Sequence, residues 1–457
     1  MSRIRPRAAP PFSSKVGGMS VTTKPERRSW NAPHRSGRLH AAVSIPGSKS
    51  QTARALVLSA LADAPSTIVN PLESRDSLLM VEGLRSLGAQ IDTGDPTRWH
   101  VQPAPQPRLR ADTSAEIDCG LSGTVLRFLP PVAALSSGDV HFDGDAYTYR
   151  RPNDGVLRGL QQLGVTVTGG EKGTLPFTVG GIGTVKGGEA TIDASASSQF
   201  ITALLLAAPR FEQGIDLRHD GPDVPSRPYL EMAVAMLRQG GVEVDNPEPN
   251  RWRVRPGPIR GREWVIEPDL QNAAPFILAP LAVGGQVTVR DWPIETTQSG
   301  DHVREIITRL GGRWEWSKGG LTVIAEPTKH NISMDLSDCS ELVPCLAALA
   351  AVTKGQMEIR GVEHIRGHET DRLSALAREL TRLGATVDEH RDGLTVFPGV
   401  PTASIFDTYD DHRMAHAGAL AGLAVGGVEL SDVACTSKTW PRFPQVWEEF
   451  VTSEEND

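Results

Sequence analysis

The sequence predicts a mixed α/β protein of two domains, each built from three copies of one supersecondary unit. The chain has 457 residues, which is long enough for two or more domains with substantial cores. One pattern recurs at intervals of roughly 70 residues, as expected for a repeated unit or a small subdomain. Each copy contains a helix that is almost wholly apolar. A solenoid is the alternative, but solenoid repeats are shorter and form a single layer.

The apolar helix is the centre of each unit. Such a helix has no polar face, so it is expected to be buried on every side and to mark the middle of a domain. The sequence predicts these helices over 53–62, 125–135, 200–208, 273–283, 342–352 and 414–425. Pro130 and Pro131 lie within the second helix and are expected to kink or interrupt it.

A short strand follows each apolar helix, and an amphipathic helix comes after a polar loop. The predicted strands are 66–69, 140–143, 215–219, 286–290, 356–360 and 428–430. In the first unit Met80 and Leu84 lie at helical spacing. Asp76 or Ser77 is the expected N-cap, and Gly88 is expected to end the helix. The unit therefore has the order strand, buried helix, strand, loop, second helix, strand.

Composition restricts the class of protein. The chain is 39% hydrophobic and 22% charged, as in globular proteins, and its net charge of −8 disfavours a polyanion such as DNA as a partner. No apolar run is long enough to cross a bilayer. The four cysteines lack metal-ligand spacing, so we expect reduced, mostly buried thiols in a cytoplasmic protein.

The ends and the middle of the chain differ from the repeats. Residues 1–36 are rich in Arg, Pro and Ser and are interpreted as a disordered N-terminal extension. A transit-like leader, or a true start at Met19, are the alternatives. Residues 451–457 are expected to form a tail. The Pro-rich stretch 247–267 is expected to be the place where the chain crosses between domains.

Polar residues precede every apolar helix and indicate an anion site. The start of a helix presents unpaired N–H groups and the positive end of its dipole. Residues 46–54 combine this with a glycine turn, a lysine, two hydroxyls and an arginine. A serine there is often only an N-cap, and the spacing is not that of a P-loop. Capping does not explain the cations at the starts of buried helices, which are Lys49, Arg54, Arg127, His412 and Arg413.

The loops after the short strands carry further charged groups. Each loop alone is more often a solvated turn, but together they favour an anionic ligand held between the domains. The candidate cations are Lys49, Arg54, Arg151, Arg372, Arg413 and Lys438, enough for two phosphate or carboxylate groups. The candidate acid–base groups are Glu341, Glu369, Asp371, His364, His368 and His412. The guanidinium groups would repel a divalent metal ion, so a metal site is disfavoured.

These motifs resemble those of the 5-enolpyruvylshikimate-3-phosphate synthase (3-phosphoshikimate 1-carboxyvinyltransferase) family. The resemblance covers about residues 38–450 and rests on PGSKS-x₃-R at 46–54, GT-x₂-R at 123–127, SSQF at 197–200, ETDR at 369–372 and DHRM at 411–414. It implies a two-domain inverse α/β barrel with three βαβαββ-like repeats per domain. Residues 38–47 and 267–450 would form domain I, and residues 48–266 domain II. The family belongs to the shikimate pathway, which leads to chorismate and the aromatic amino acids, and it is the target of glyphosate.

The resemblance also implies the residues that bind two small-molecule substrates. Those for shikimate 3-phosphate are Lys49, Ser50, Arg54, Ser197, Ser198, Gln199, Ser226, Tyr229, Glu341, His364 and His368. Those for phosphoenolpyruvate are Lys49, Gly123, Arg151, Gln199, Arg372, Arg413 and Lys438. The implied catalytic groups are Glu341 and His368 at the substrate hydroxyl, and Glu369 as the proton donor. The resemblance implies no cofactor, metal, nucleic acid or membrane partner, and we expect a monomer.

Several positions depart from the family pattern, and two alternative functions stay open. Leu121 replaces an Asn, so backbone N–H groups must hold the phosphate there, and Glu341 replaces an Asp. His364 and His368 replace an Asn and a Lys, and a neutral or titrating imidazole at 368 is expected to make catalysis more sensitive to pH than a lysine would. A UDP-N-acetylglucosamine enolpyruvyl transferase of the same fold would need a reactive cysteine such as Cys119. A non-catalytic anion-binding relative is the other alternative.

Overall fold

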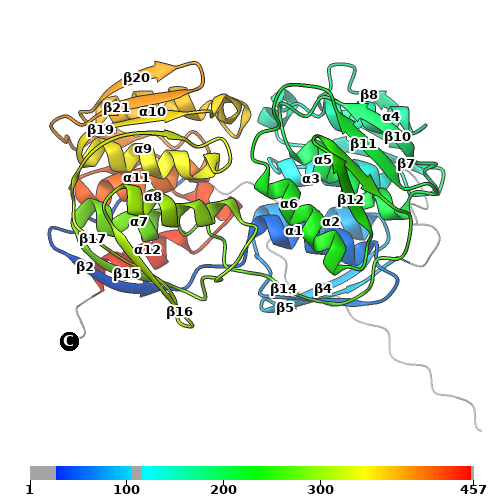
Figure 1. The fold of residues 1–457 in the computed structure, drawn as a ribbon, viewed down its shortest axis with the longest axis horizontal. Coiled ribbons are helices and arrows are strands. Elements are labelled where there is room, and N and C mark those ends of the chain that lie inside the picture. The colour runs from blue at the N-terminus through cyan, green and yellow to red at the C-terminus, as the bar shows by residue number, and fades with distance from the viewer. Residues whose placement is uncertain (1–26, 105–114, 454–457) are drawn as a thin grey trace, which may run out of the picture.

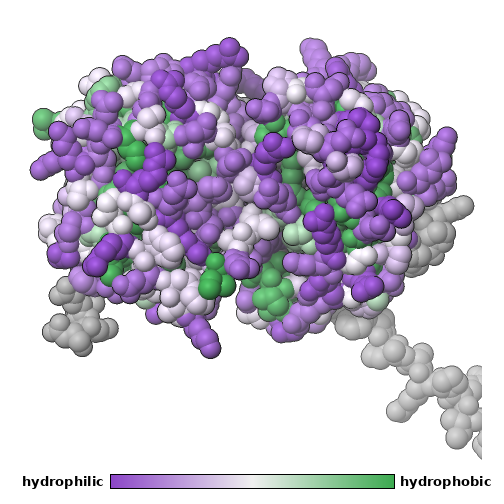
Figure 2. All heavy atoms as spheres, in the orientation of Figure 1, coloured by the Kyte–Doolittle hydropathy of each residue, from purple (hydrophilic) through white to green (hydrophobic). Residues whose placement is uncertain are grey.

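The computed structural model describes residues 27–104 and 115–453. These residues form two bodies that lie side by side (Figure 1), each with a hydrophobic core of its own. The core of the first body runs from Ala53 to Ile266, and the core of the second combines residues 30–45 with residues 270–451. Hydrophilic residues cover most of the face in Figure 2. We propose that the two bodies are the two domains, with the boundaries that the sequence predicts.

The predicted unit recurs with the same sheet in five copies. Each sheet has four strands, in which two strands pair in parallel and a hairpin adds two antiparallel strands. In the second, third and fifth units the parallel pair consists of the strands before and after the buried helix. The third unit shows the order most clearly. Its elements are β10 (Gly188–Ile192), α5 (Gln199–Ala207), β11 (Ile215–His219), α6 (Pro228–Gln239), β12 (Val244–Glu248) and β13 (Arg251–Val254).

The other complete units have the same composition. The second contains β6 (Ala115–Asp118), α3 (Gly123–Ala133), β7 (Asp139–Asp143), α4 (Asp154–Gln162), β8 (Thr166–Gly169) and β9 (Phe177–Gly180). The fifth contains β18 (Lys329–Asp335), α9 (Val343–Val352), β19 (Lys354–Arg360), α10 (Arg372–Arg382), β20 (Thr386–His390) and β21 (Gly393–Phe397).

The first and fourth units exchange their leading strands where the chain crosses between the bodies. The first unit contains α1 (Lys49–Ala60), β3 (Ser66–Val69), α2 (Arg75–Ser86), β4 (Gln90–Asp95) and β5 (Arg98–Gln102). The fourth contains α7 (Ala274–Val283), β15 (Gly285–Arg290), α8 (Val303–Arg309), β16 (Arg313–Ser317) and β17 (Gly320–Ala325). β2 (Leu39–Val43) precedes α1 but pairs with β15, and β14 (Glu263–Val265) precedes α7 but pairs with β3. The chain therefore crosses between the bodies twice.

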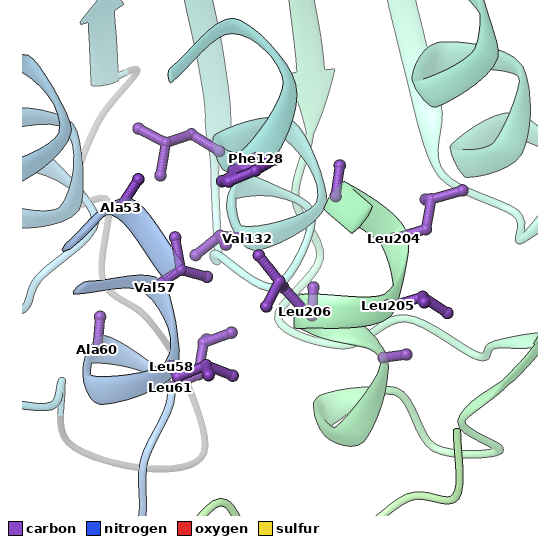
Figure 3. Close-up of a cluster of buried hydrophobic side chains, with 14 of the residues drawn as sticks. Ala53, Val57, Leu58, Ala60, Leu61, Phe128, Val132, Leu204, Leu205 and Leu206 are labelled. Carbon is purple, nitrogen blue, oxygen red and sulfur yellow. The ribbon is translucent and has the colours of Figure 1, made fainter. Parts of the chain in front are cut away.

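The six apolar helices lie where the sequence predicts them. In the first body α1, α3 and α5 pack against one another, and Figure 3 shows Val57, Val132 and Leu206 meeting between them. In the second body α7, α9 and α11 (His412–Ala424) do the same. Because these helices are covered on every side, only their ends are open to a ligand.

The two prolines are predicted to kink or interrupt the second apolar helix, and the interruption is wrong. α3 runs from Gly123 to Ala133 with Pro130 and Pro131 inside it. Pro130 has no N–H to donate to the carbonyl oxygen of Leu126, four residues earlier. The side chain of Asn153 donates to that oxygen instead, at 3.2 Å. This tertiary hydrogen bond compensates for the missing donor and allows the helix to continue.

The predicted cap of α2 is also wrong by a few residues. Ser74 is the N-cap, and its hydroxyl accepts from the backbone N–H of Ser77, whose side chain bonds back to complete a capping box. Asp76 is buried instead, and it lies 3.4 Å from the ammonium of Lys49. Gly88 follows the helix with a φ of 98°, as predicted for its C-terminal stop.

A sixth complete unit is not present in the described chain. The sixth sheet has only three strands and lacks the hairpin. Two of its strands, β22 (Ile405–Phe406) and β23 (Glu429–Leu430), come from the repeat, and the third, β1 (Trp30–Asn31), pairs antiparallel with β23. The last helix, α12 (Phe443–Thr452), contains the first two residues of the predicted tail.

The interpretation of residues 1–36 as disordered is therefore wrong for residues 27–36, while residues 1–26 lie outside the described part. Trp30 is only 7% exposed, and its indole donates to Glu448 at 2.8 Å. The backbone of Arg28 bonds to Asp432 and Val433. In the short sixth sheet, the N-terminal segment supplies β1, which pairs with the edge of β23.

Replacing Trp30 with Ala is expected to lower the free energy of unfolding of the second body by about 3–5 kcal/mol, because a large buried side chain leaves a cavity. Urea unfolding followed by circular dichroism measures this. Trp314→Ala is the matched control, since Trp314 is 37% exposed and loses less buried contact. Equal losses in both variants would contradict a structural role for the N-terminal segment.

Candidate active site

The starts of all six buried helices meet at one cavity between the two bodies. It has a volume of about 940 Å³. Lys49, Gly123 and Gln199 reach it from the first residues of α1, α3 and α5. From the second body, Gln271, Glu341 and Arg413 reach it at the starts of α7, α9 and α11. The positive ends of six helix dipoles therefore lie around one space, which favours anionic ligands.

Almost all the predicted site residues lie in the wall of this cavity. They are Lys49, Ser50, Arg54, Gly123, Arg151, Ser197, Ser198, Gln199, Ser226, Tyr229, Glu341, His364, His368, Glu369 and Arg413. Arg372 and Lys438 are the exceptions, because they lie behind the wall and hold its carboxylates. Asp371 caps α10 and pairs with Arg366 at 2.9 Å, so its role is structural.

The guanidinium of Arg54 is buried, and no carboxylate of the described residues pairs with it. It donates to the carbonyl oxygens of Ser50 at 2.8 Å and Tyr229 at 3.0 Å, and it lies 5.3 Å from the ring centre of Phe128. Burial lowers the pKa of Arg54 to about 10, which still leaves it charged at neutral pH. Two carbonyls do not neutralise a cation, so an anion in the cavity would be strongly attracted.

Two further cations, Arg127 and Arg151, lie at the start of α3. Arg127 is equally buried and was not among the residues that the resemblance assigns, although its place at a helix start suggested it. Its guanidinium donates to the side chain of Gln199 at 2.7 Å, and burial together with the charge of Arg151 lowers its pKa to about 9. Arg151 donates to the carbonyl of Leu121 at 2.8 Å. Both partners are neutral, as for Arg54.

Gly123 allows this arrangement to form. A Cβ atom at this position would lie 2.8 Å from the guanidinium of Arg151 and 3.2 Å from the side-chain oxygen of Gln199. The first of these distances is too short for a carbon atom. The absence of a side chain therefore lets Arg151 and Gln199 approach the N–H groups at the start of the helix.

The cations of the second body are paired with carboxylates instead. Glu341 accepts from Arg372 at 3.2 Å and from Arg413 at 3.0 Å, and these guanidinium groups hold its pKa well below the usual range. Glu369 accepts from Arg372 at 3.0 Å and from Lys438. Lys438 and Arg372 likewise hold its pKa well below the usual range. Both carboxyl groups are thus ionised in this state.

The histidines at 364 and 368 are neutral. The Nδ1 atom of His368 accepts from Arg372 at 2.9 Å, so the proton of the ring is on Nε2, and the 3.4 Å between Nδ1 and Glu341 is not a hydrogen bond. Burial and the charge of Arg372 lower the pKa of His368 to about 3, and burial lowers that of His364 to about 4. Neither ring titrates near pH 7 in this state, and the pH sensitivity of catalysis expected from His368 stays a prediction. His412 also lines the cavity, and burial lowers its pKa as well.

Acid is expected to destabilise the fold below pH 6.5 because of these rings. In the unfolded chain His364 and His368 bind protons from about pH 6.5, whereas in the folded protein they do so only near pH 4 and pH 3. The free energy of unfolding is therefore unaffected by these rings above pH 6.5. It decreases as the pH falls below that value, by up to about 2 kcal/mol per histidine at pH 5. Urea midpoints measured from pH 8 to pH 5 test this. A constant midpoint would contradict it.

Ser226 has an uncommon backbone conformation in the cavity wall. Its φ of 55° lies in the left-handed region, which is costly for a residue with a Cβ atom and often marks a functional position. Its backbone N–H donates across the cavity edge to the carbonyl of Ser337 in the second body, at 3.2 Å. Within the described ranges, no group of three or more His, Cys, Asp or Glu side chains is placed to bind a metal ion.

Comparison with known proteins agrees with this geometry. The sequence model for EPSP synthase (3-phosphoshikimate 1-carboxyvinyltransferase) matches residues 33–447. A curated relative, the 3-phosphoshikimate 1-carboxyvinyltransferase of Kocuria rhizophila, is 49% identical over 431 residues, covering 93% of this chain and 97% of the relative.

Solved structures confirm the fold. The EPSP synthase of Acinetobacter baumannii matches with a TM-score of 0.73 and 23% identity over 90% of this chain and 96% of that chain. The enolpyruvyl transferase NikO of Streptomyces tendae matches with a TM-score of 0.70 and 20% identity over 91% of this chain and 96% of that chain. The predicted two-domain inverse α/β barrel is therefore confirmed. Together with the family match over most of its length, this shows that the chain belongs to the EPSP synthase (3-phosphoshikimate 1-carboxyvinyltransferase) family.

Proposed function

We propose that this protein transfers the enolpyruvyl group of phosphoenolpyruvate to the 5-hydroxyl of shikimate 3-phosphate and releases phosphate. The observation that carries this proposal is the cavity, in which buried cations that have no carboxylate partner in the described part of the chain face ionised acid–base groups. Both substrates are anions of a size that such a cavity can enclose. The product would enter the shikimate pathway toward chorismate and the aromatic amino acids.

The two places where the first body holds cations suggest where each substrate binds. Arg54 lies on α1, and its guanidinium reaches Tyr229 at the start of α6, where it would face the phosphate of shikimate 3-phosphate. Phosphoenolpyruvate would bind at the start of α3, where Gly123 brings the N–H groups close to Arg151. There the amides and the guanidinium would share its anionic groups. Arg127 would add to the positive potential at the same place.

The reaction needs a base at the hydroxyl and an acid at carbon. The 5-oxygen forms a bond to C2 and loses its proton, while C3 gains a proton; phosphate then leaves C2 as C3 loses a proton again. Glu341 is ionised, so it can accept the hydroxyl proton, with the neutral ring of His368 beside it. Glu369 would serve C3, but it is ionised in this state.

Substrate binding itself would prepare Glu369. Its pKa is low because Lys438 and Arg372 neutralise it. When the phosphate and carboxylate of phosphoenolpyruvate draw these two cations away, the carboxyl loses its counter-charges and gains an anion nearby. Both changes raise the pKa of Glu369. The acid would thus become protonated only when the substrate that it must protonate is bound.

Contacts between the bodies favour a closed, water-poor site. The ammonium of Lys438 in the second body donates to the carbonyl of Leu121 in the first, at 3.1 Å. The sequence predicts that backbone N–H groups near Leu121 hold the phosphate. The backbone carbonyl of Leu121 also contributes, because it accepts hydrogen bonds from the two cations Lys438 and Arg151. Excluding water protects the intermediate and strengthens every charge interaction in the cavity.

The alternative functions have less support. A UDP-N-acetylglucosamine transferase needs a reactive thiol, but Cys119 is fully buried and burial raises its pKa. We therefore expect thiol alkylation to leave activity unchanged. The free cysteines of the described chain also support a cytoplasmic protein. We further propose that the protein acts as a monomer.

Phosphate release is the test of this function. Purified protein is mixed with phosphoenolpyruvate and shikimate 3-phosphate, and inorganic phosphate is measured. Turnover is expected with this pair and not when UDP-N-acetylglucosamine replaces shikimate 3-phosphate. Release with the nucleotide sugar only would favour the second transferase, and no release with either would favour a non-catalytic relative.

Replacing Gly123 with Ala is expected to raise KM for phosphoenolpyruvate about 5- to 150-fold, because the new methyl group displaces the guanidinium of Arg151 at a cost of about 1–3 kcal/mol. By family resemblance, inhibition by glyphosate should weaken as well. Gly257→Ala is the control, since a Cβ atom there would meet no atom within 4 Å. Unchanged KM and inhibition in the Gly123 variant would contradict the placement of phosphoenolpyruvate.

A further inference from the structure

Three side chains form a bridge between the two bodies at the cavity edge. The hydroxyl of Ser340 lies 2.9 Å from Nε2 of His364 and 3.5 Å from the hydroxyl of Ser226. Ser340 and His364 belong to the second body, at the starts of the short helices η4 (Ser340–Leu342) and η5 (Glu363–Gly367). Ser226 precedes α6 in the first body. Ser340 is only 2% exposed and does not line the cavity, whereas the other two residues do.

The number of protons in this bridge limits how it can be arranged. A neutral imidazole has one N–H, and each serine hydroxyl has one O–H. If Nε2 of His364 carries the proton, it donates to Ser340, and Ser340 can donate to Ser226. The single proton of Ser226 is then free to point into the cavity. If Nδ1 carries the proton instead, Ser340 donates to His364, and Ser226 must donate to Ser340.

The two arrangements present different groups to a ligand. In the first, Ser226 offers a hydrogen-bond donor to the cavity, and in the second it offers only lone pairs. An anionic phosphate oxygen accepts hydrogen bonds and cannot donate them. A phosphorylated ligand beside Ser226 therefore selects the first arrangement, with the proton of His364 on Nε2. The neutral state of His364 is what makes both arrangements possible.

We propose that Ser340 is a positioning residue, which joins His364 to Ser226 so that the Ser226 hydroxyl donates to the phosphate of the bound substrate. This inference rests on the proposed function, because it takes shikimate 3-phosphate as the ligand near Ser226. The 3.5 Å between the two hydroxyls is long. Hydrogen bonds in ligand-free sites are often long and shorten when the ligand binds.

The backbone of Ser226 supports the same inference. Its left-handed φ of 55° is unfavourable for serine, and its N–H bonds to the carbonyl of Ser337 in the second body. Both contacts of Ser226 with the second body would be lost if the bodies separated. The hydroxyl donor would then lose its fixed direction. Ser340 thus makes this part of the phosphate site depend on the closed arrangement.

The test is the variant Ser340→Ala. The hydrogen bond from Ser226 to the charged phosphate is expected to weaken when Ser340 no longer fixes its direction, which raises KM and the dissociation constant for shikimate 3-phosphate about 5- to 30-fold. The kcat value and KM for phosphoenolpyruvate are expected to change less than about twofold, as for an effect confined to one substrate. Ser59→Ala is the matched control, because Ser59 is also fully buried and its hydroxyl has no hydrogen-bond partner within the described chain.

A second measurement separates this role from a general loss of structure. Nitrogen NMR of the imidazoles is expected to show His364 with its proton on Nε2 when shikimate 3-phosphate is bound, and a mixture of tautomers in Ser340→Ala. Unchanged affinity for shikimate 3-phosphate in Ser340→Ala would overturn the inference, and so would an equal loss for both substrates. Failure of the proposed function would differ from both, since the unaltered protein itself would then release no phosphate.

Discussion

Replacing Glu369 with Gln is expected to lower kcat by about 10²–10⁴-fold, while shikimate 3-phosphate binds with nearly unchanged affinity. The amide keeps the size of the side chain but cannot deliver a proton to carbon. It also releases Lys438 and Arg372 from the ion pairs that they make with Glu369. Affinity for phosphoenolpyruvate should therefore be retained or increased, because both cations become available to its anionic groups.

This combination of effects distinguishes an acid from a binding residue. Steady-state kinetics give kcat, and calorimetry gives the two dissociation constants. Glu82→Gln is the control, since Glu82 makes an exposed ion pair with Arg85 on α2, away from the cavity. Full turnover in the Glu369 variant would exclude it as the acid. A loss of phosphoenolpyruvate affinity would show that the carboxylate positions Lys438 and Arg372 rather than competing for them.

The buried helices could be predicted from the sequence because an all-apolar helix leaves little choice of environment. Once 53–62 or 414–425 is buried, only its ends can meet a ligand, so charged residues at those ends indicate a site. That reasoning identified Arg127 as a helix-start cation even though the family resemblance gave it no role. The cavity wall contains it together with the residues that the resemblance named.

Other features depend on contacts between distant residues, which no local pattern contains. α3 continues through its prolines because Asn153, more than twenty positions away from Leu126, supplies the missing donor. β1 forms because the sixth sheet has an unpaired edge, and Arg and Pro in the N-terminal segment gave no sign of it. The Nδ1 atom of His368 accepts from Arg372, and this fixes a neutral ring that composition could not predict.

The charge pattern of the cavity explains why both bodies are needed. The first body supplies cations with neutral partners, such as Arg54 and Arg127, and the second supplies carboxylates that are already paired. An anion that enters the cavity neutralises the cations of the first body. It also draws cations away from the carboxylates of the second body. Binding and the preparation of the acid are thus two results of the same redistribution of charge, which requires the two bodies to be together.

Lys49→Met is expected to raise KM for both substrates by roughly 10- to 100-fold, since each would lose a charged hydrogen bond of about 1.5–3 kcal/mol. Lys49 begins α1 at the junction of the bodies, where its backbone N–H donates to Asp269 at 2.9 Å. Its ammonium lies 3.4 Å from Asp76 and lines the cavity, so it can turn from that carboxylate to a ligand.

The shared role of Lys49 follows from where it stands between the two proposed subsites. Lys49 and Ser50 begin the helix that holds Arg54, on the side proposed for shikimate 3-phosphate. His412 and Arg413 of the second body line the same cavity, and Lys49 lowers the pKa of His412 by its charge. Lys186→Met, on an exposed loop, is the control for loss of a positive charge alone. A loss confined to shikimate 3-phosphate would show that Lys49 serves one subsite, and phosphoenolpyruvate would then depend on Arg151 and the second body.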